Sequence, residues 1–238
     1  MKLLLTSSGI TNASLRSALV DLLGKPVEDA SALVVPTGMH PFSVGQVTGR
    51  LMRAEVGASL TGLGWKALGL LELTALPSID REVWLSAVRE TDALLVWGGE
   101  PVYLAHWLRE SGLAGELPSR DLVYVGVSAG AMAATTVVVE TYTEPRTSAG
   151  ATLRSEEVTF AGEVARTLVT ADGAGFVEVS LIPHYDNASH PDASVENAPV
   201  WAARIPAPTY ALDDQSGLRV VDGAVEVVSE GSWHLFTT

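Results

Sequence analysis

The chain has 238 residues, of which 47% are hydrophobic and 18% charged, and its formal net charge is −13. This composition is typical of a globular protein with a large core, and an acidic chain with scattered Lys and Arg excludes nucleic acid as a partner, because backbone phosphates require a basic surface. The chain contains no cysteine, which excludes disulfides, thiolate zinc sites and cysteine nucleophiles.

Apolar stretches in the sequence are short. The N-terminal run in MKLLLTSSGI is too short for the hydrophobic region of a secretion signal. No apolar stretch approaches the roughly eighteen residues that a membrane span needs. We therefore expect a cytoplasmic protein with no membrane partner. Internal repeats, low-complexity tracts and clear linkers are absent from the sequence, so residues 1–238 are expected to form a single domain.

The first half of the chain alternates short apolar runs with helix-length amphipathic segments. Strands are expected at residues 2–7, 32–38, 66–73, 93–99 and 122–128. Helices are expected at about 12–23, 43–56, 80–90 and 102–111. Continuously apolar strands separated by helices are typical of a parallel sheet that is buried on both faces. The pattern predicts an α/β fold, a doubly wound three-layer sandwich.

The pattern changes after about residue 140. Residues 140–157 are polar and irregular, and residues 177–184 form one more apolar run that predicts a buried strand. Residues 208–236 predict short antiparallel strands, with turn signals at Gly217 and at Asp222-Gly223. The loops GGEP, GVSAG and PHYDN each follow an expected strand. We expect them to meet at one edge of the sheet, where such folds build their sites.

A Gly-x-Ser-x-Gly sequence centred on Ser128 lies where an expected strand becomes a helix. A serine hydroxyl becomes a nucleophile when a base takes its proton and a sharp turn exposes it, and glycines two positions on either side relieve the crowding of that turn. The main-chain N–H of Ala129 would be the first oxyanion donor. The pattern also arises by chance, and a glycine-flanked turn can bind phosphate. The apolar strand before Ser128 and the small residues after it favour the nucleophile.

Three segments resemble the peptidase E (dipeptidase E) family of serine peptidases, which belongs to the class I glutamine amidotransferase-like superfamily. They are GVSAGA at 126–131, LLVWGGEPVYL at 94–104 and LIPHYDN at 181–187. The resemblance implies a flavodoxin-like sandwich with a mostly parallel sheet and small antiparallel strands near the C-terminus. It also implies a hydrolase that cleaves small peptides through an acyl-enzyme.

The resemblance assigns roles to four of the matched residues. Ser128 would be the nucleophile and His184 the general base. The main-chain amides of Gly99 and Ala129 would bind the oxyanion. The family needs no metal or other cofactor for this chemistry, and a monomer or a homodimer is expected.

The third member of the triad has several candidates. The family's acid lies on the loop after the serine segment, next to the position of Glu144, which is therefore expected first. Asp186 is second, because the amidotransferase relatives carry an acid two residues after the histidine, and Glu140 is third. Asp213 and Asp214 are weaker candidates, interpreted as turn or cap residues.

Two departures from the family pattern concern the substrate. Glu100 replaces the asparagine that usually follows the glycine pair, and this changes the charge beside the oxyanion site. The aspartate-specific members carry a Gly-Glu-Thr-Arg stretch after the histidine, where this chain has HPDASVENAPVW. Strict specificity for an N-terminal aspartate is therefore not expected. Glu100 and Trp97 are candidate substrate contacts, and Trp201 is a second possible pocket wall.

Three alternative functions remain open at this point. Another acyl hydrolase, cyanophycinase-like or an esterase, would use the same Ser128 and His184. A catalytically inactive binding protein would keep the scaffold without the chemistry. The sequence H-x-D-x-x-x-H-x-D, which runs from His184 to Asp192, has plausible metal ligands, although a polar surface loop is the favoured interpretation.

Overall fold

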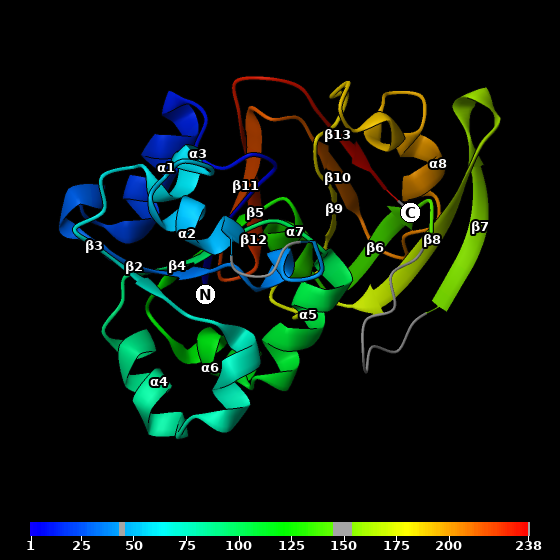
Figure 1. The fold of residues 1–238 in the computed structure, drawn as a ribbon. Coiled ribbons are helices and arrows are strands. Elements are labelled where there is room, and N and C mark those ends of the chain that lie inside the picture. Colours follow the sequence, from blue (N-terminus) through cyan, green and yellow to red (C-terminus); the bar gives the residue numbers. More distant parts are fainter. Residues whose placement is uncertain (43–45, 145–153, 238) are drawn as a thin grey trace.

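The protein is described by a computed structural model that covers residues 1–42, 46–144 and 154–237. Within these residues the strands form three sheets, and the largest has the strand order β12-β11-β1-β5-β4-β2-β3 (Figure 1). Its members are β1 (Lys2–Thr6), β2 (Ser31–Val35), β3 (Ala67–Leu70), β4 (Ala93–Val96), β5 (Val123–Val127), β11 (Ser216–Val221) and β12 (Ala224–Ser229).

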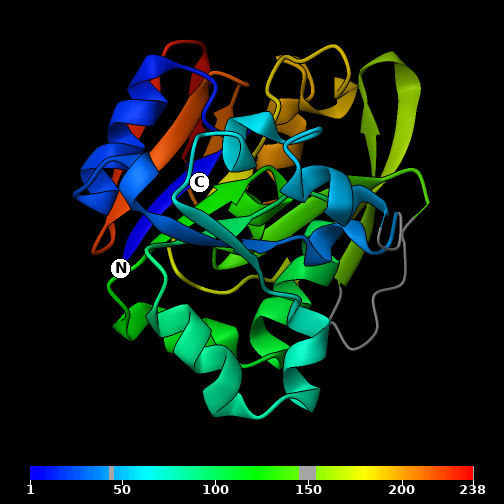
Figure 2. The ribbon, with the colours of Figure 1, turned by 60° about the vertical axis from the view of Figure 1, so that its left-hand side comes forward.

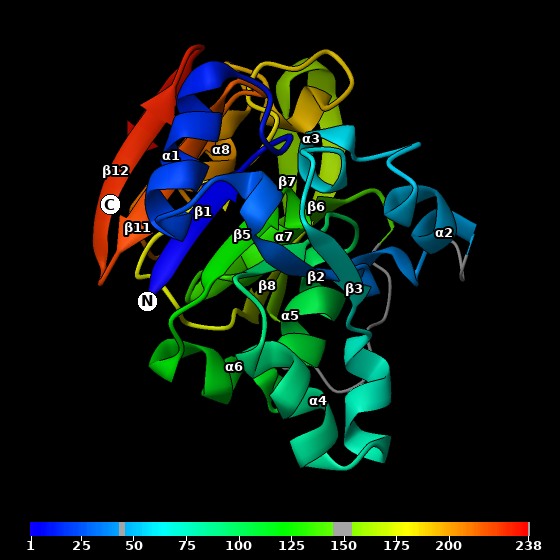
Figure 3. The ribbon, with the colours of Figure 1, turned by 90° about the vertical axis from the view of Figure 1, so that its left-hand side faces the viewer.

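The central sheet is mostly parallel. Strands β1, β5, β4, β2 and β3 run in one direction. Beyond β1 the sheet continues with β11, which is antiparallel to β1, and with β12, which is antiparallel to β11 (Figure 3). The predicted doubly wound α/β sandwich is thus confirmed. The turn predicted at Asp222-Gly223 joins β11 to β12, whereas Gly217 lies inside β11 and marks no turn.

Helices cover both faces of the central sheet, as its apolar strands require. On β1, Leu4 packs with α1, α2 and α3, while Leu3 and Leu5 point to the other face, where α4, α5, α6 and α7 lie. The helices are α1 (Ala13–Leu23), α2 (Gln46–Met52), α3 (Ala58–Thr61), α4 (Arg81–Arg89), α5 (Pro101–Glu110), α6 (Leu113–Glu116), α7 (Ala129–Ala133) and α8 (Ala198–Ala202). None of the described helices is both long and apolar enough to cross a membrane.

Two small sheets flank the central one. The first has the order β13-β10-β9, with β9 (Ser180–Ile182), β10 (Thr209–Leu212) and β13 (Trp233–Phe236). The second has the order β6-β8-β7, with β6 (Val137–Tyr142), β7 (Arg154–Phe160) and β8 (Val164–Asp172). The hairpin of β7 and β8 projects at the edge of the molecule (Figure 2).

The small sheets correct one sequence interpretation and extend another. Residues 140–157 were expected to be irregular, yet they begin in β6 and end in β7. On β7 only Val158 and Phe160 are buried, so pairing with β8 rather than core burial defines this strand, and the sequence lacks an apolar signal for it. Within residues 208–236 the predicted antiparallel strands are present, since β10 pairs antiparallel with β13 and β11 pairs antiparallel with β12. β10 also pairs parallel with β9, a partner that was not assigned from the sequence.

Candidate active site

Ser128 lies on a sharp turn between β5 and α7. Its backbone has φ 52° and ψ −114°, a conformation that L-residues rarely adopt and that persists only where the surroundings hold it. A Cβ on Gly130 would lie 2.1 Å from the Val96 carbonyl oxygen, and one on Gly126 would lie 2.6 Å from the Gly130 carbonyl oxygen. Both positions therefore require glycine. The Gly-x-Ser-x-Gly pattern predicts this requirement, because the turn is too crowded for a larger side chain.

His184 reaches Ser128 from the end of β9. The distance between His184 Nε2 and Ser128 Oγ is 2.9 Å. His184 follows β9 by two residues, and its own N–H donates to Ser7 Oγ at 3.1 Å. Ser7 in turn donates to the Leu212 carbonyl at 2.6 Å, so the loop after β1 ties the ends of β9 and β10 together.

Asp214 contacts the opposite nitrogen of the same ring. Its Oδ1 lies 2.7 Å from His184 Nδ1 and accepts a hydrogen bond from Ser8 Oγ at 2.6 Å, while its Oδ2 accepts one from Asn187 Nδ2 at 2.5 Å. Burial raises the pKa of Asp214, but the hydrogen bonds from Ser8, His184 and Asn187 outweigh burial and hold it below the usual value. An ionised carboxylate only accepts, so Nδ1 carries the proton and Nε2 accepts from Ser128.

The carboxylate beside His184 therefore differs from the sequence expectation. Within the described residues, the ring of His184 forms no hydrogen bond with any of the three expected acids, Glu144, Asp186 and Glu140. Glu144 is exposed after β6. Asp214 bonds to the ring, although its neighbour Asp213 acts as the turn residue that was expected, with Oδ1 accepting from Ser216 Oγ at 2.6 Å.

A sequence signal for Asp214 does exist. His184 follows the last residue of β9 by two positions, and Asp214 follows the last residue of β10 by two positions. Because β9 and β10 are parallel, these two ends lie at the same edge. No partner was assigned to either strand from the sequence, so the sequence did not reveal this relation.

The two expected oxyanion amides lie beside Ser128. Gly98 follows β4, and a Cβ placed on it would contact Ser128 Cβ at 3.4 Å, so the glycine pair is adjacent to the serine. Gly99 has φ 130°, which is a conformation for glycine alone. Within the described residues, neither the Gly99 N–H nor the Ala129 N–H donates to a protein acceptor.

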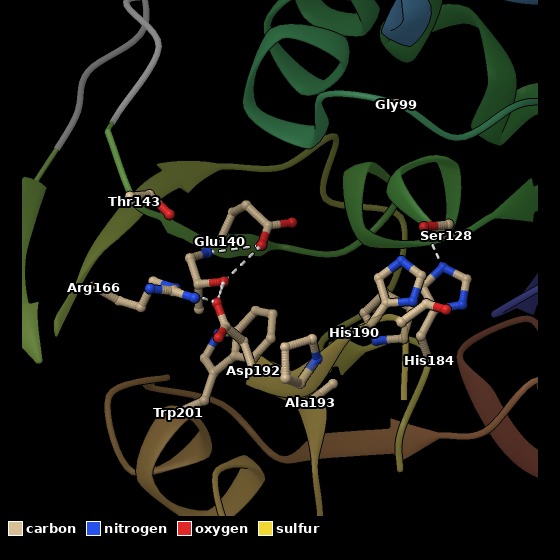
Figure 4. Close-up of a pocket in the computed structure, with 14 residues that line it drawn as sticks. Gly99, Ser128, Glu140, Thr143, Arg166, His184, His190, Asp192, Ala193 and Trp201 are labelled. Atoms are coloured by element: carbon tan, nitrogen blue, oxygen red, sulfur yellow. Dashed lines mark hydrogen bonds and ion pairs between the residues drawn. The ribbon is translucent and has the colours of Figure 1, made fainter. Parts of the chain in front are cut away.

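Ser128 and His184 open on a cavity of about 340 Å³ (Figure 4). Its other walls come from the loops after β4 and β9 and from the sheet of β6 and β8. They are Gly99, Glu140, Thr141, Thr143, Arg166, Pro183, Ser189, His190, Pro191, Asp192, Ala193 and Trp201. Trp201 is thus a wall of this cavity, as the sequence suggested, and its indole N–H donates to the Val139 carbonyl at 3.2 Å.

The two expected substrate contacts lie outside this cavity. Trp97 lines a separate hollow of about 270 Å³ that Ser128 and His184 also line, so it stays a candidate substrate contact. Glu100 lines a neighbouring cavity of about 650 Å³, but only 2% of the residue is exposed. Its side chain caps α5 by accepting from the Tyr103 N–H, and it also accepts from the Tyr142 hydroxyl. The environment of Glu100 fits a structural role.

Sequence reasoning named Glu140 and Asp192 for other roles and missed Arg166, so it did not predict the charged wall of the cavity. Arg166 on β8 donates to Asp192 at 2.8 Å, and Asp192 also accepts from Thr141 Oγ1 at 2.9 Å. Glu140 on β6 is half-buried, and burial raises its pKa to about 8. Arg166 lies on β8, within residues 158–176, for which no element was predicted from the sequence, so its place in the cavity wall had no signal.

His190 stacks on the ring of His184, with centroids 4.0 Å apart and planes 13° from parallel (Figure 4). Burial and the neighbouring His184 lower the pKa of His190. The sequence cluster from His184 to Asp192 does not converge as a ligand set, since Asp192 pairs with Arg166 instead. Over residues 1–42, 46–144 and 154–237, three or more His, Asp or Glu side chains do not gather in a way that suits a metal ion.

Comparison with known proteins identifies the family of the chain. The model of peptidase family S51 matches residues 3–228. A "Putative Peptidase E Protein" from Listeria monocytogenes EGD-e has a similar structure, with a TM-score of 0.65 and 15% identity over 97% of this chain and 98% of that chain. A peptidase from an acI-B1 Actinobacterium has a TM-score of 0.64 and 19% identity over 98% of this chain and 89% of that chain. No curated protein sequence matches this chain. Since the family model spans nearly all of the sequence, the chain belongs to peptidase family S51 and is a serine-type peptidase.

Proposed function

We propose that the protein hydrolyses short peptides through an acyl-enzyme on Ser128, with His184 as general base and Asp214 as the acid that orients it. The single observation that carries this proposal is the hydrogen-bond chain from Ser128 Oγ through His184 to Asp214, at 2.9 Å and 2.7 Å, on the wall of a cavity. Each contact lies within hydrogen-bonding distance for proton transfer.

In the first half of the reaction, Ser128 Oγ attacks the peptide carbonyl while its proton moves to His184 Nε2. The carbonyl oxygen becomes negative and is stabilised by the main-chain N–H groups of Gly99 and Ala129. His184 then gives the proton to the leaving amine as the C–N bond breaks. Asp214 stays ionised throughout and stabilises the imidazolium that forms in between.

In the second half, a water molecule replaces the amine. His184 takes a proton from the water, the resulting hydroxide attacks the acyl carbon, and Ser128 recovers its proton as the ester bond breaks. The cavity volume of about 340 Å³ lies near the lower end for small-molecule sites, which favours short peptides over long chains. Strict N-terminal aspartate specificity is disfavoured, because Arg166 is already paired with Asp192.

Covalent labelling combined with a substrate panel tests the proposal. A small sulfonyl fluoride or phosphonate should add to Ser128, as identified by peptide mass spectrometry, and Ser128→Ala should abolish both the label and peptide cleavage. Ser189→Ala is a matched control, because Ser189 lines the same cavity without bonding to His184, and it should keep both. Labelling of Ser128 with turnover of a chromogenic ester but of no di- or tripeptide would replace the peptidase assignment with another acyl hydrolase activity.

A further inference from the structure

Glu140 is a half-buried carboxylate in the wall of the cavity that also holds Ser128, and the proposed hydrolysis has no use for it. It lies on β6 and lines the same cavity as Ser128 and His184. Its Oε1 accepts from the main-chain N–H of Thr141 at 2.7 Å. Its Oε2 has no hydrogen-bond partner within the described part of the chain, and Figure 4 shows one carboxylate oxygen directed into the cavity without an interaction.

The other charges around Glu140 do not neutralise it. Among the described residues, Arg166 on β8 is the one Lys or Arg that lines the cavity, and its guanidinium is paired with Asp192 at 2.8 Å. Glu100, at the start of α5, adds a second negative charge nearby, and repulsion from it and from Asp192 adds to the effect of burial on Glu140. The two histidines of the cavity stack on one another, and burial lowers the pKa of His190, which favours its neutral form.

We infer that this cavity binds the cationic group of the first residue of a short peptide, either its α-ammonium or a side-chain ammonium, with Glu140 as the counter-ion. The inference rests on the proposed peptide hydrolysis at Ser128. Glu140 is half-buried and Oε2 has no protein partner among the described residues, so a cation that enters the cavity can form an ion pair with this oxygen at a partly desolvated position. The apolar surfaces of Trp201 and Ala193 offer contact for the aliphatic stem of a side-chain ammonium.

Binding of a cation would be linked to the release of a proton from Glu140. The pKa of Glu140 is about 8, so near neutral pH the empty cavity holds the carboxyl in its protonated form. An ammonium within hydrogen-bonding distance favours the ionised form. The ligand therefore enters as a cation, Glu140 forms the ion pair, and its proton leaves to solvent.

Three ligands that cannot be cleaved separate the two sources of charge. Norleucine amide carries only the α-ammonium, N-acetyl-lysine amide carries only the side-chain ammonium, and N-acetyl-norleucine amide carries neither. Calorimetry at pH 8 should show that at least one cationic ligand binds about tenfold or more tighter than the neutral one. Glu140→Gln keeps the size of the side chain and should reduce this preference to less than about threefold.

Asp186→Asn is the matched control. It removes one negative charge from the loop after β9, at a residue that does not line the cavity. This variant should keep the wild-type preference for the cationic ligand. Equal binding of cationic and neutral ligands to the wild type would overturn the inference, and so would a preference that survives Glu140→Gln or disappears equally in Asp186→Asn.

The proton linkage gives a second readout. The side chain of N-acetyl-lysine amide stays charged to about pH 10, so its affinity reports the titration of Glu140. Where this ligand is the preferred one, its affinity should rise up to about tenfold between pH 7 and pH 9, and Glu140→Gln should flatten the rise. Since these ligands are not cleaved, the result stands apart from Ser128 labelling: failure to label would overturn the hydrolysis, and failure to discriminate charge would overturn the cation site.

Discussion

The proposed role of Asp214 as the triad acid can be tested with one substitution, Asp214→Asn. Asp214 Oδ2 accepts from the Asn187 amide, and Asp214 Oδ1 faces His184 Nδ1. In the variant, the new amide must keep its oxygen toward Asn187, because two NH₂ groups facing each other would clash. The NH₂ of residue 214 then points at His184 Nδ1 and forces that nitrogen to accept.

This change in hydrogen bonding moves the imidazole proton to Nε2. In that tautomer His184 cannot accept the proton of Ser128, although the two side chains stay within reach. A wrong tautomer in an otherwise intact triad lowers the rate about 10⁴-fold, which corresponds to roughly 5.4 kcal/mol of transition-state stabilisation. We expect kcat to fall by about that factor, with little change in KM.

Steady-state kinetics on the dipeptide that the wild type cleaves best provides the assay. Glu144→Gln and Asp186→Asn are the controls, because neither side chain contacts His184, and both should stay within about threefold of the wild type in kcat. Asp214 would not be the acid that orients His184 if Asp214→Asn kept more than about a tenth of the activity, or if one of the controls lost activity by orders of magnitude.

A second substitution distinguishes an effect of the tautomer from an effect of the lost charge. In the double variant Asp214→Asn with Asn187→Asp, the new carboxylate accepts from the amide at residue 214 and turns its oxygen back toward His184 Nδ1. Activity should then rise at least about tenfold above that of Asp214→Asn alone. Without such a rise, the loss in the single variant would have to come from the missing charge rather than from the tautomer.

Three further predictions concern the surroundings of the triad. Gly130→Ala places a Cβ 2.1 Å from a carbonyl oxygen of β4 and should lower the free energy of unfolding by about 3 kcal/mol or more in urea titrations, whereas Gly115→Ala, with open space around it, should stay within about 0.5 kcal/mol. Because the pKa of Asp214 is depressed in the fold, its stabilising contribution is present above about pH 4 and lost as the pH falls through the folded-state value, so the difference in melting temperature between wild type and Asp214→Asn should shrink in acid. His190→Phe should keep the stack on His184 and most of kcat, while His190→Ala should lose up to about tenfold, since an aromatic pair is worth about 0.5–1.5 kcal/mol.

The central sheet was predictable because its strands are buried on both faces. Runs such as ALLV in β4 and VYVGV in β5 are buried at every residue, and that continuous burial appears in the sequence as an unbroken apolar run. The glycines around Ser128 were predictable for a related reason, since the close approach of neighbouring chains leaves no room for a Cβ. Elements defined by burial therefore leave a mark in the sequence.

Strands that are held mainly by pairing with a neighbouring strand are harder to recognise in the sequence. Most residues of β7 are exposed, and this strand is held by its ladder to β8, so the polar sequence between residues 154 and 160 carried no period to detect. The strand direction of β10 is equally a matter of pairing. The same four residues, TYAL, would be apolar in a parallel or an antiparallel neighbour of β9, and only the parallel arrangement brings Asp214 to His184.

The residues of the site come from elements of both kinds, those defined by burial and those defined by pairing. Ser128 and the two amides come from the ends of central strands, whereas His184 follows β9, a buried strand of a small sheet, and all four residues were identified from the sequence. Glu140 and Arg166 come from β6 and β8, on the other small sheet. The proposed reacting atoms are thus held at the ends of buried strands, while Glu140 and Arg166 lie in the sheet of β6 and β8. Substitutions on β6 and β8 are therefore expected to change which peptide is bound while the hydrogen-bond chain at Ser128 stays in place.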